Sequence, residues 1–154
     1  MSTVEIEPGT RTTPLVTTPS RVRMADTDAA KLIFFGCVFR WSDVLFTDFF
    51  AATGKPLSRH FADGVGFPAV RTESEYRYPL GLDDEIELEL WTGHIGERSF
   101  SLVTRVFVDV HGERREAVRA RVWHTYVEMR PGQDRDAPEV TTAPLPDWLR
   151  AALS

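Results

Sequence analysis

One segment of the chain, residues 34–52, restricts the possible folds most, because it is apolar on nearly every side of a helix. Large apolar residues recur there in steps of three and four, and others between them widen the apolar stripe until little of the helix can face water. The recurring residues are Phe34, Val38, Trp41, Leu45, Phe49 and Ala52, and those between them are Phe35, Phe39, Val44, Phe46 and Phe50. Gly54 and Pro56 follow in the order that ends a helix. The sequence therefore predicts one helix that is buried on most sides.

Strand-like patterns dominate the second half of the chain. Period-two alternation and many β-branched and aromatic side chains mark four segments, which are residues 67–78, 85–91, 98–110 and 113–129. The turns between them are too short for crossover helices, so neighbouring strands must pair antiparallel. Such a sheet buries one mostly apolar helix in its concave face. This predicts an α+β chain with the hot-dog arrangement, an antiparallel sheet wrapped around a central helix.

The 154 residues are expected to form one domain with a segment at each end. Residues 1–14 are expected to be a flexible arm, because the first 18 residues hold six threonines, two prolines and one glycine without a sustained period. Residues 15–130 form the domain, with a sheet edge near Leu15 and Val16 and a short strand over 21–25. Residues 131–154 are expected to be an irregular strap with a short helix over 147–153.

Composition narrows the class of protein. The formal net charge of −5 argues against nucleic acid as a partner, and the lack of an 18-residue apolar run argues against a membrane span. Cys37 is the only cysteine, which excludes an intramolecular disulfide and a cysteine-cluster zinc site. The lone thiol and the absence of a signal pattern indicate a cytoplasmic protein, and Cys37 is expected to be buried and inert. The four histidines show no ligand spacing, so neither a metal nor another cofactor is expected.

Several motifs occur in an order that is typical of one family. Asp26-Thr-Asp28 precedes the aromatic helix with its Arg40-Trp41 pair, and further motifs follow: Phe67-Pro-Ala-Val, Tyr76-Arg-Tyr-Pro, Asp83-Asp84 and Gly96-Glu-Arg-Ser-Phe100. Over residues 15–130 this order resembles the hot-dog acyl-CoA thioesterases of the 4-hydroxybenzoyl-CoA thioesterase type. The resemblance implies hydrolysis of an acyl-CoA or acyl-carrier-protein thioester to an acid and a thiol.

The same resemblance makes Asp28 the catalytic carboxylate, either as nucleophile or as base for water, and the backbone amide of Phe35 the group that polarises the thioester carbonyl. The physical logic is general, since a helix N-terminus offers free N–H groups and a positive dipole end. Without this resemblance, the position of Asp28 before an apolar helix would indicate a helix N-cap. Asp26 is expected to brace the turn. Glu73 is the runner-up catalyst, because another branch of aryl-CoA thioesterases uses a strand glutamate.

Substrate contacts are expected along the helix. Phe34 and Val38 serve the core, yet the aromatic crowding around them suits a planar aromatic or polyketide-like acyl group. By resemblance Asp43 lies near the substrate ring, where a buried acceptor would hold a ring hydroxyl; an exposed carboxylate is the alternative. Lys31 stands where the family motif has glycine, and it is either solvated or turned to the site to favour ionised Asp28 or an acidic substrate.

Contacts outside the helix are implied by the resemblance alone. Gly64 and Gly66 would bring backbone close to the thioester, and Arg98 and Ser99 would meet the phosphates and pantetheine of CoA near a subunit boundary. The strand over 113–129 carries apolar residues on both faces, so its outward face is expected to meet a second copy in a dimer or tetramer.

Two rival functions stay open at this point. Relatives that act on aliphatic or mixed thioesters carry His and Tyr at the positions of Phe35 and Val38, so this chain lacks a helix-borne acid or base. Together with Lys31, this motivates a protein that binds an acyl thioester or polyketide without cleaving it. A hot-dog dehydratase is the second rival, and it would need a helix histidine near the site.

Overall fold

The structure is a computed structural model that describes residues 5–132 and 137–154. Its main sheet has five strands in the order β1-β4-β5-β6-β3, and every neighbouring pair is antiparallel. These strands are β1 (Val16–Arg21), β3 (Ala69–Tyr76), β4 (Glu85–Ile95), β5 (Ser99–Val110) and β6 (Glu113–Thr125). A smaller sheet contains β2 (Val65–Gly66), β7 (Val127–Arg130) and β8 (Glu139–Thr142). The helices are α1 (Cys37–Ala52), α2 (Leu57–Ala62) and α3 (Asp147–Leu153), with a 3-10 turn over Met24–Asp26.

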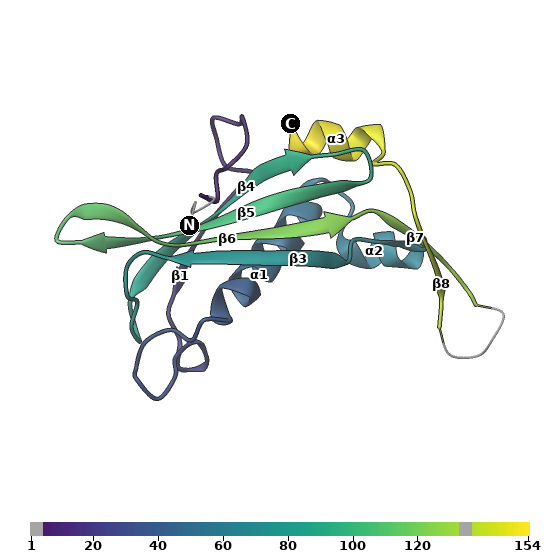
Figure 1. Ribbon diagram of the computed structural model, residues 1–154. Coiled ribbons are helices and arrows are strands. Elements are labelled where there is room, and N and C mark those ends of the chain that lie inside the picture. The colour runs from purple at the N-terminus through teal and green to yellow at the C-terminus, as the bar shows by residue number, and fades with distance from the viewer. Residues whose placement is uncertain (1–4, 133–136) are drawn as a thin grey trace.

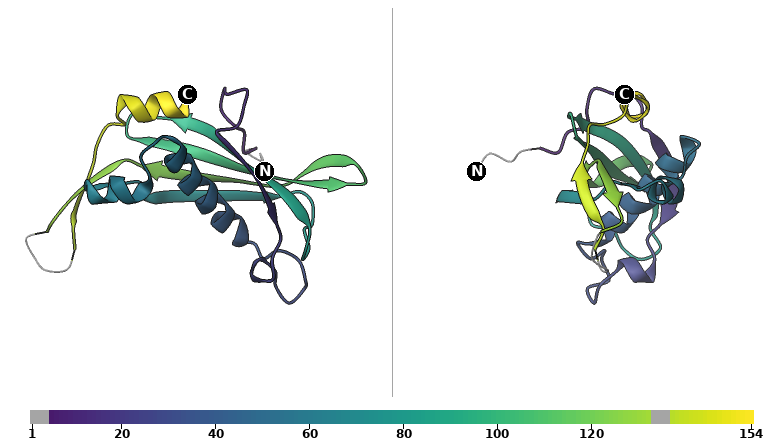
Figure 2. Two further views of the ribbon diagram at one scale, coloured as in Figure 1. Left: turned by 180° about the vertical axis from the view of Figure 1, so that it is seen from behind. Right: turned by 90° about the vertical axis from the view of Figure 1, so that its right-hand side faces the viewer.

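Helix α1 crosses one face of the main sheet, as Figures 1 and 2 show, and its buried residues form the core with that face. Val38, Leu45 and Phe50 are fully buried because the apolar stripe predicted from their spacing packs on the inward residues of β4, β5 and β6. The predicted hot-dog arrangement is confirmed. Among the described residues no helix is both long and apolar enough to span a membrane.

The helix begins later than predicted, at Cys37 rather than at residue 34. The N–H of Phe34 donates to the carbonyl of Asp26 at 2.9 Å, which draws residues 34–36 into a turn ahead of the helix. Gly36 is the N-cap, and a Cβ there would lie 2.8 Å from the ring of Phe34. The close approach of that ring therefore requires glycine at the start of α1.

The first strand also differs from the prediction. β1 covers Val16–Arg21 instead of residues 21–25, and Val16 pairs with Leu90 at the sheet edge predicted for Leu15 and Val16. Pro19 lies within this strand, which an edge position tolerates because one side of the strand needs no N–H donors. The chain then turns at Met24–Asp26, so Met24 belongs to a 3-10 turn, and Val22 lies between β1 and that turn rather than in a strand.

The segment predicted as one strand over 113–129 is two strands in two sheets. β6 ends at Thr125, and β7 leaves the main sheet to pair with β2 and β8. The outward face of β6 carries Arg119 and Arg121 as well as Trp123, and it lies against the start of the chain. The tail contains β8, which was not predicted, whereas the helix over 147–153 is confirmed.

Residues 5–9, which belong to the predicted arm, lie on this outer face of the sheet. Ile6 is buried and its N–H donates to Glu75 at 3.0 Å, while its carbonyl accepts from Arg119 at 2.5 Å. The N–H of Gly9 donates to the carbonyl of Thr92 at 2.6 Å. This part of the arm therefore covers the face opposite α1, and the first four residues lie outside the described part of the chain.

Candidate active site

Asp28 lies in the loop between the 3-10 turn and α1, and it is exposed on one side of a cavity of about 490 Å³. Its Oδ1 accepts the N–H of Ala30 at 2.8 Å, which closes the loop in an Asx turn. Other residues that line this cavity include Leu32, Ile33, Phe35, Tyr76, Tyr78 and Leu80. We call it the Asp28 cavity. One carboxylate thus both closes its own loop and lines a cavity that is open to solvent.

Phe35 lines the same cavity, directly before α1. Within residues 5–132 and 137–154 its N–H makes no hydrogen bond, and the N-cap Gly36 has no side chain that could cap the helix. The carbonyl of Phe35 accepts a hydrogen bond from the hydroxyl of Tyr76 on β3. The residue directly before the N-cap of α1 therefore carries a free N–H and lines the same cavity as Asp28, and its own carbonyl is bonded to Tyr76 of the sheet.

Asp26 braces the loop, as predicted. Its buried carboxylate accepts from the N–H of Arg23 at 2.8 Å and forms an ion pair with Arg40 of α1. Arg40 also donates to the carbonyl of Ala25 at 2.9 Å. Because these contacts join the loop to the helix, the loop that carries Asp28 and the helix start that carries Phe35 are fixed relative to each other.

Lys31 occupies the left-handed region, with a φ of 65°. Glycine adopts this conformation without steric cost, which explains why the family motif has glycine at this position. Here the loop adopts the same left-handed conformation with a lysine. The side chain of Lys31 is exposed and forms no ion pair with any residue that the structure describes. It does not line the Asp28 cavity, which agrees with the solvated alternative.

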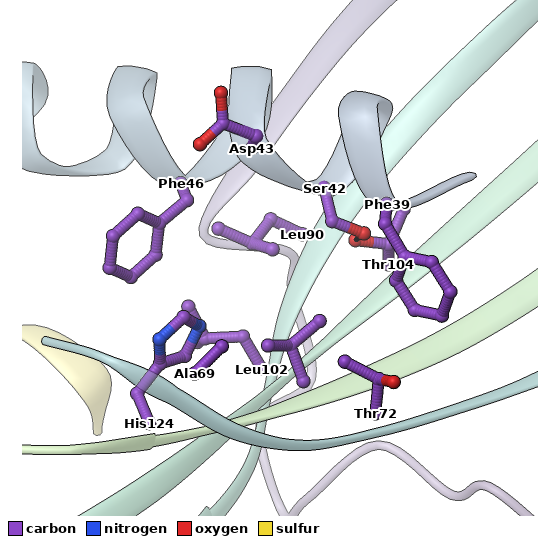
Figure 3. Close-up of a pocket in the computed structure, with 11 residues that line it drawn as sticks. Phe39, Ser42, Asp43, Phe46, Ala69, Thr72, Leu90, Leu102, Thr104 and His124 are labelled. Atoms are coloured by element: carbon purple, nitrogen blue, oxygen red, sulfur yellow. Dashed lines mark hydrogen bonds between the residues drawn. The ribbon is translucent and has the colours of Figure 1, made fainter. Parts of the chain in front are cut away.

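A second cavity of about 170 Å³ lies between α1 and the sheet (Figure 3). It is mostly apolar and is lined by Phe39, Ser42, Asp43, Phe46, Ala69, Thr72, Leu90, Leu102, Thr104, Val122 and His124. We call it the His124 cavity. Asp43 is exposed at its rim, so the carboxylate expected near a substrate ring lies at the entrance and not inside.

Three buried polar side chains line the His124 cavity. The hydroxyls of Ser42 and Thr104 are 2.8 Å apart, and both residues are buried. His124 is 8% exposed, and its ring stacks on Phe46 with centroids 4.4 Å apart. Burial lowers the pKa of His124, which keeps the imidazole neutral at physiological pH.

The two cavities follow one another between α1 and β3. Phe35 in the Asp28 cavity and Phe39 in the His124 cavity are four residues apart, so they lie on one side of the helix. Tyr76 and Thr72 are likewise four residues apart, on the same face of β3. A group that enters at Asp28 can therefore extend along α1 toward His124.

Other predicted site residues lie elsewhere in the chain. Glu73 faces away from α1, where its carboxylate accepts weakly from Trp123 at 3.5 Å and lies 3.9 Å from Arg121. Val38 is fully buried in the core, and Phe34 packs over the N-cap glycine with the guanidinium of Arg40 5.9 Å from its ring centroid.

Gly66 pairs with Val127 of β7, and the carbonyl of Gly64 accepts from the N–H of Met129. β7 lies near α2, which follows the end of α1, whereas Asp28 precedes its start (Figure 1). A Cβ at Gly64 would be 2.7 Å from the carbonyl oxygen of Met129, and one at Gly66 would be 3.2 Å from its Cε. Within one chain these glycines permit the close packing of β7. Arg98 and Ser99 are near this end too: Arg98 donates to Thr142 at 3.4 Å, and Ser99 pairs with Thr125.

Cys37 is fully buried, and burial together with nearby Asp26 raises the pKa of its thiol to about 12. The prediction of a buried thiol is therefore confirmed, and the raised pKa agrees with an unreactive one. Over residues 5–132 and 137–154, no three His, Cys, Asp or Glu side chains are grouped so that they could hold a metal ion.

Sequence reasoning missed several residues of the two cavities. Tyr76 was noted only within a motif, and Ser42, Thr104 and His124 were not singled out. A usable signal was present for His124, because it continues the inward alternation of Val118, Ala120 and Val122 on β6. A polar residue at an inward position of a strand is a candidate for a cavity.

Comparisons with known proteins agree with this geometry. A family model described as "Thioesterase-like superfamily" matches residues 22–153. The 1,4-dihydroxy-2-naphthoyl-CoA hydrolase of Synechococcus elongatus is 28% identical over 131 residues, which cover 84% of this chain and 90% of that protein.

Solved structures share the fold. The 4-hydroxybenzoyl-CoA thioesterase from Pseudomonas sp. strain CBS-3 superimposes with a TM-score of 0.72 at 19% identity, covering 88% of this chain and 96% of that one. A 1,4-dihydroxy-2-naphthoyl-CoA thioesterase from Synechocystis gives a TM-score of 0.74 at 19% identity, covering 89% and 93%. These TM-scores establish a common fold, and the family match over most of the sequence establishes the relationship: the chain belongs to the Thioesterase-like superfamily.

Proposed function

We propose that the protein hydrolyses an acyl-CoA thioester with an aromatic or polyketide-like acyl group. The observation that carries the proposal is the shared cavity of Asp28 and Phe35, which is lined by a carboxylate and by a residue whose unpartnered N–H directly precedes the N-cap of α1. Relatives named for hydrolysis of 1,4-dihydroxy-2-naphthoyl-CoA support the choice of substrate class. An acyl-carrier-protein thioester presents the same reacting group and is tested beside CoA.

The thioester carbonyl oxygen would accept from the N–H of Phe35, which points from the positive end of the helix dipole. Asp28 then acts in one of two ways. As nucleophile, its oxygen bonds to the carbonyl carbon, the C–S bond breaks, CoA leaves as a thiolate, and water later cleaves the mixed anhydride. As general base, it takes a proton from a water that attacks the carbon directly.

The acyl group would extend from Asp28 along α1 into the His124 cavity. Phe39 and Phe46 line that cavity, and planar groups stack well on aromatic rings. The small volume of the cavity limits the inserted part to about one ring. An aromatic or polyketide-like acyl group fits these walls better than a branched aliphatic one.

A second copy of the chain would complete the site. β3 is an edge strand of the main sheet and is largely exposed over residues 69–72. Its Ala69 end adjoins Gly66, and its Tyr76 end adjoins the Asp28 cavity. Antiparallel pairing of two β3 strands would therefore place Gly64 and Gly66 of one copy beside Asp28 of the other, which supports a homodimer.

The same pairing would carry Arg98 and Ser99 of the second copy toward the thioester, where they would meet the phosphates and pantetheine of CoA. Light scattering coupled to size-exclusion chromatography should then give at least a dimer, and a monomer would contradict this arrangement. A cytoplasmic location stays a prediction that rests on the single cysteine.

A panel of aryl-CoA, fatty acyl-CoA and acyl-carrier-protein thioesters, followed with a thiol-trapping dye, tests the function directly. We expect turnover of at least one aryl-CoA, and its loss in Asp28→Asn. The Asn side chain keeps an acceptor for the N–H of Ala30, so the loop is retained while the carboxylate is removed. Thioester binding without turnover would instead favour the non-hydrolytic reading.

The two routes differ in where labelled oxygen first appears. Under single-turnover conditions in heavy-oxygen water, the nucleophilic route leaves label in the Asp28 carboxylate when water attacks the enzyme carbonyl of the anhydride, whereas the general-base route labels only the product acid. Mass spectrometry of the peptide that contains Asp28 separates these outcomes. The same experiment with an enoyl thioester, checked for a hydrated product, tests the dehydratase alternative.

A further inference from the structure

The two buried hydroxyls in the His124 cavity, those of Ser42 and Thr104, have no spare proton. Ser42 donates to the carbonyl of Val38 at 2.9 Å, and a carbonyl can only accept. The 2.8 Å contact between Ser42 and Thr104 must then have Thr104 as its donor. Both protons are used within the protein, so these hydroxyls can offer the cavity only lone pairs.

His124 also offers the cavity only an acceptor, for a different reason. Its Nδ1 lies 3.0 Å from the carbonyl oxygen of Phe67, so Nδ1 carries the proton of the neutral ring. Nε2 is then an acceptor, and no described residue donates to it. Stacking on Phe46 and on Phe100, with centroids 4.4 and 5.3 Å away, holds the ring in this orientation.

The hydroxyl of Thr72 also lines the cavity and makes no hydrogen bond to any described residue, but Thr72 is an exposed residue of β3. The buried part of the cavity therefore presents acceptors in an apolar wall without a free donor. We infer that it recognises a hydrogen-bond donor, of which a hydroxyl is the simplest, on the part of the acyl group that enters between α1 and the sheet. This inference rests on the proposed function for the identity of the ligand as an acyl group. A ketone, an ether or a carboxylate is only an acceptor, so at that position it would find no donor. It would lose its hydrogen bonds to water without gaining any to the protein.

The place of the donor on the acyl group follows from helix geometry. Ser42 is five residues after Cys37, the first residue of α1, which corresponds to about 7.5 Å along a helix that rises 1.5 Å per residue, and Phe35 precedes that start by two more residues. The donor is therefore far from the thioester carbon, at the distal end of the acyl group. The volume of about 170 Å³ is close to that of a cavity of about 150 Å³ that binds benzene, so one ring fills it.

Binding of small probes tests the inference without any catalysis. Phenol, anisole and toluene are titrated against the protein and followed through the Nε2 resonance of His124 in protein labelled with ¹⁵N-histidine. Phenol should bind about three- to tenfold more tightly than anisole or toluene, the value of one hydrogen bond, and should shift the Nε2 resonance. Equal affinities, or no change at Nε2, would overturn the inference.

Kinetics with matched substrates tests it on the reaction. We choose 4-hydroxycinnamoyl-CoA, cinnamoyl-CoA and 4-methoxycinnamoyl-CoA, in which the substituent is far from the thioester. The wild type should favour the hydroxyl compound in kcat/KM by about three- to tenfold. His124→Phe should remove this preference while keeping an aromatic ring between Phe46 and Phe100.

His94→Phe is the matched control, because His94 lies on β4 against Trp123 and outside both cavities. It should leave the preference for the hydroxyl compound unchanged. Thr104→Val is the second test variant in case His124→Phe does not fold, and it should weaken the preference too. A preference that persists in every folded cavity variant would contradict the inference.

The outcomes separate the two proposals. If no thioester is hydrolysed but phenol still binds selectively through His124, the proposed function fails and the donor-recognising cavity stands. If thioesters are hydrolysed but the hydroxyl compound has no advantage in the wild type, the function stands and the donor-recognising cavity is refuted.

Discussion

The two cavities between α1 and β3 are built in opposite ways. The Asp28 cavity is exposed, and its reactive geometry comes mainly from backbone: a free N–H at Phe35, an Asx turn at Asp28 and a left-handed Lys31. The His124 cavity is lined by side chains of α1 and four strands, and its buried polar groups are side chains that are already hydrogen-bonded.

This contrast assigns the reaction to the Asp28 cavity and the choice of substrate to the His124 cavity. Backbone groups tolerate many side chains, so the Asp28 cavity can keep one reaction while its residues vary, as Phe35 and Lys31 illustrate. Side chains on a rigid sheet define size and hydrogen bonding, so the His124 cavity can change the substrate without disturbing the reaction. Variants at the first should alter kcat, and variants at the second should alter the ranking of substrates.

The largest effect is expected from Asp28→Asn, which should reduce kcat by at least about 100-fold while leaving the melting temperature nearly unchanged, because the side chain is exposed. Asp26→Asn is the matched comparison two residues away. It weakens a buried ion pair and should lower the free energy of unfolding by about 1–3 kcal/mol. Steady-state assays and denaturant unfolding measure the two effects. If Asp28→Asn kept its activity, the backbone-and-carboxylate account of this cavity would fail.

Tyr76→Phe is expected to have the next largest effect, because the hydroxyl of Tyr76 holds the carbonyl of Phe35. We expect kcat to fall about tenfold with a smaller change in KM, since the loss of one positioning hydrogen bond misplaces the donor to the oxyanion. Tyr78→Phe is the control, because Tyr78 lines the same cavity and its hydroxyl makes no hydrogen bond to any described residue. Equal kinetics for the two variants would exclude a positioning role for Tyr76.

Replacing Lys31 with glycine should stabilise the protein. A side chain in the left-handed region is strained, and Lys31→Gly should raise the free energy of unfolding by about 0.5–1 kcal/mol. Lys31→Ala should bring no such gain, since alanine has the same Cβ. Thermal unfolding distinguishes these outcomes, and a catalytic loss in both variants would instead indicate that Lys31 acts on the substrate.

The smallest effect is expected in the pH dependence of stability. Burial lowers the pKa of His124 in the folded state, so protons bind more readily to the unfolded chain below the ordinary histidine pKa of about 6.5. Stability is therefore full above that pH and falls as the pH drops toward the lowered pKa. In His124→Phe the decline between pH 6.5 and 5 should be shallower, as measured by urea unfolding; an unchanged slope would show that this histidine does not contribute.

Much of the fold could be predicted because the strongest patterns were local. The apolar stripe of α1 and the period-two alternation of β4 fixed a helix against an antiparallel sheet. The start of α1 was misplaced because a hydrogen bond from Phe34 to the carbonyl of Asp26 overrides the apolar spacing. β1 was displaced since Pro19 argues against a strand unless its edge position is known.

The site was predictable only in part. The motif order pointed to Asp28 and Phe35, which the structure brings to one cavity, and to Gly64 and Arg98, which it does not bring there within one chain. Distances across a subunit boundary leave no periodic signal in a single sequence. Tyr76 and His124 were not predicted as site residues, because whether they line a cavity depends on which face of their strand packs against α1.

The path of residues 5–9 over the outer face of the sheet has a practical consequence. Arg119 and Arg121 there donate to the carbonyl oxygens of Ile6 and Glu7, and Ile6 is buried. A truncation that starts at residue 10 would remove both of these acceptors and expose the surface that Ile6 covers, which favours aggregation during expression. Recombinant forms should therefore carry any affinity tag at the carboxyl terminus and leave the leading residues native.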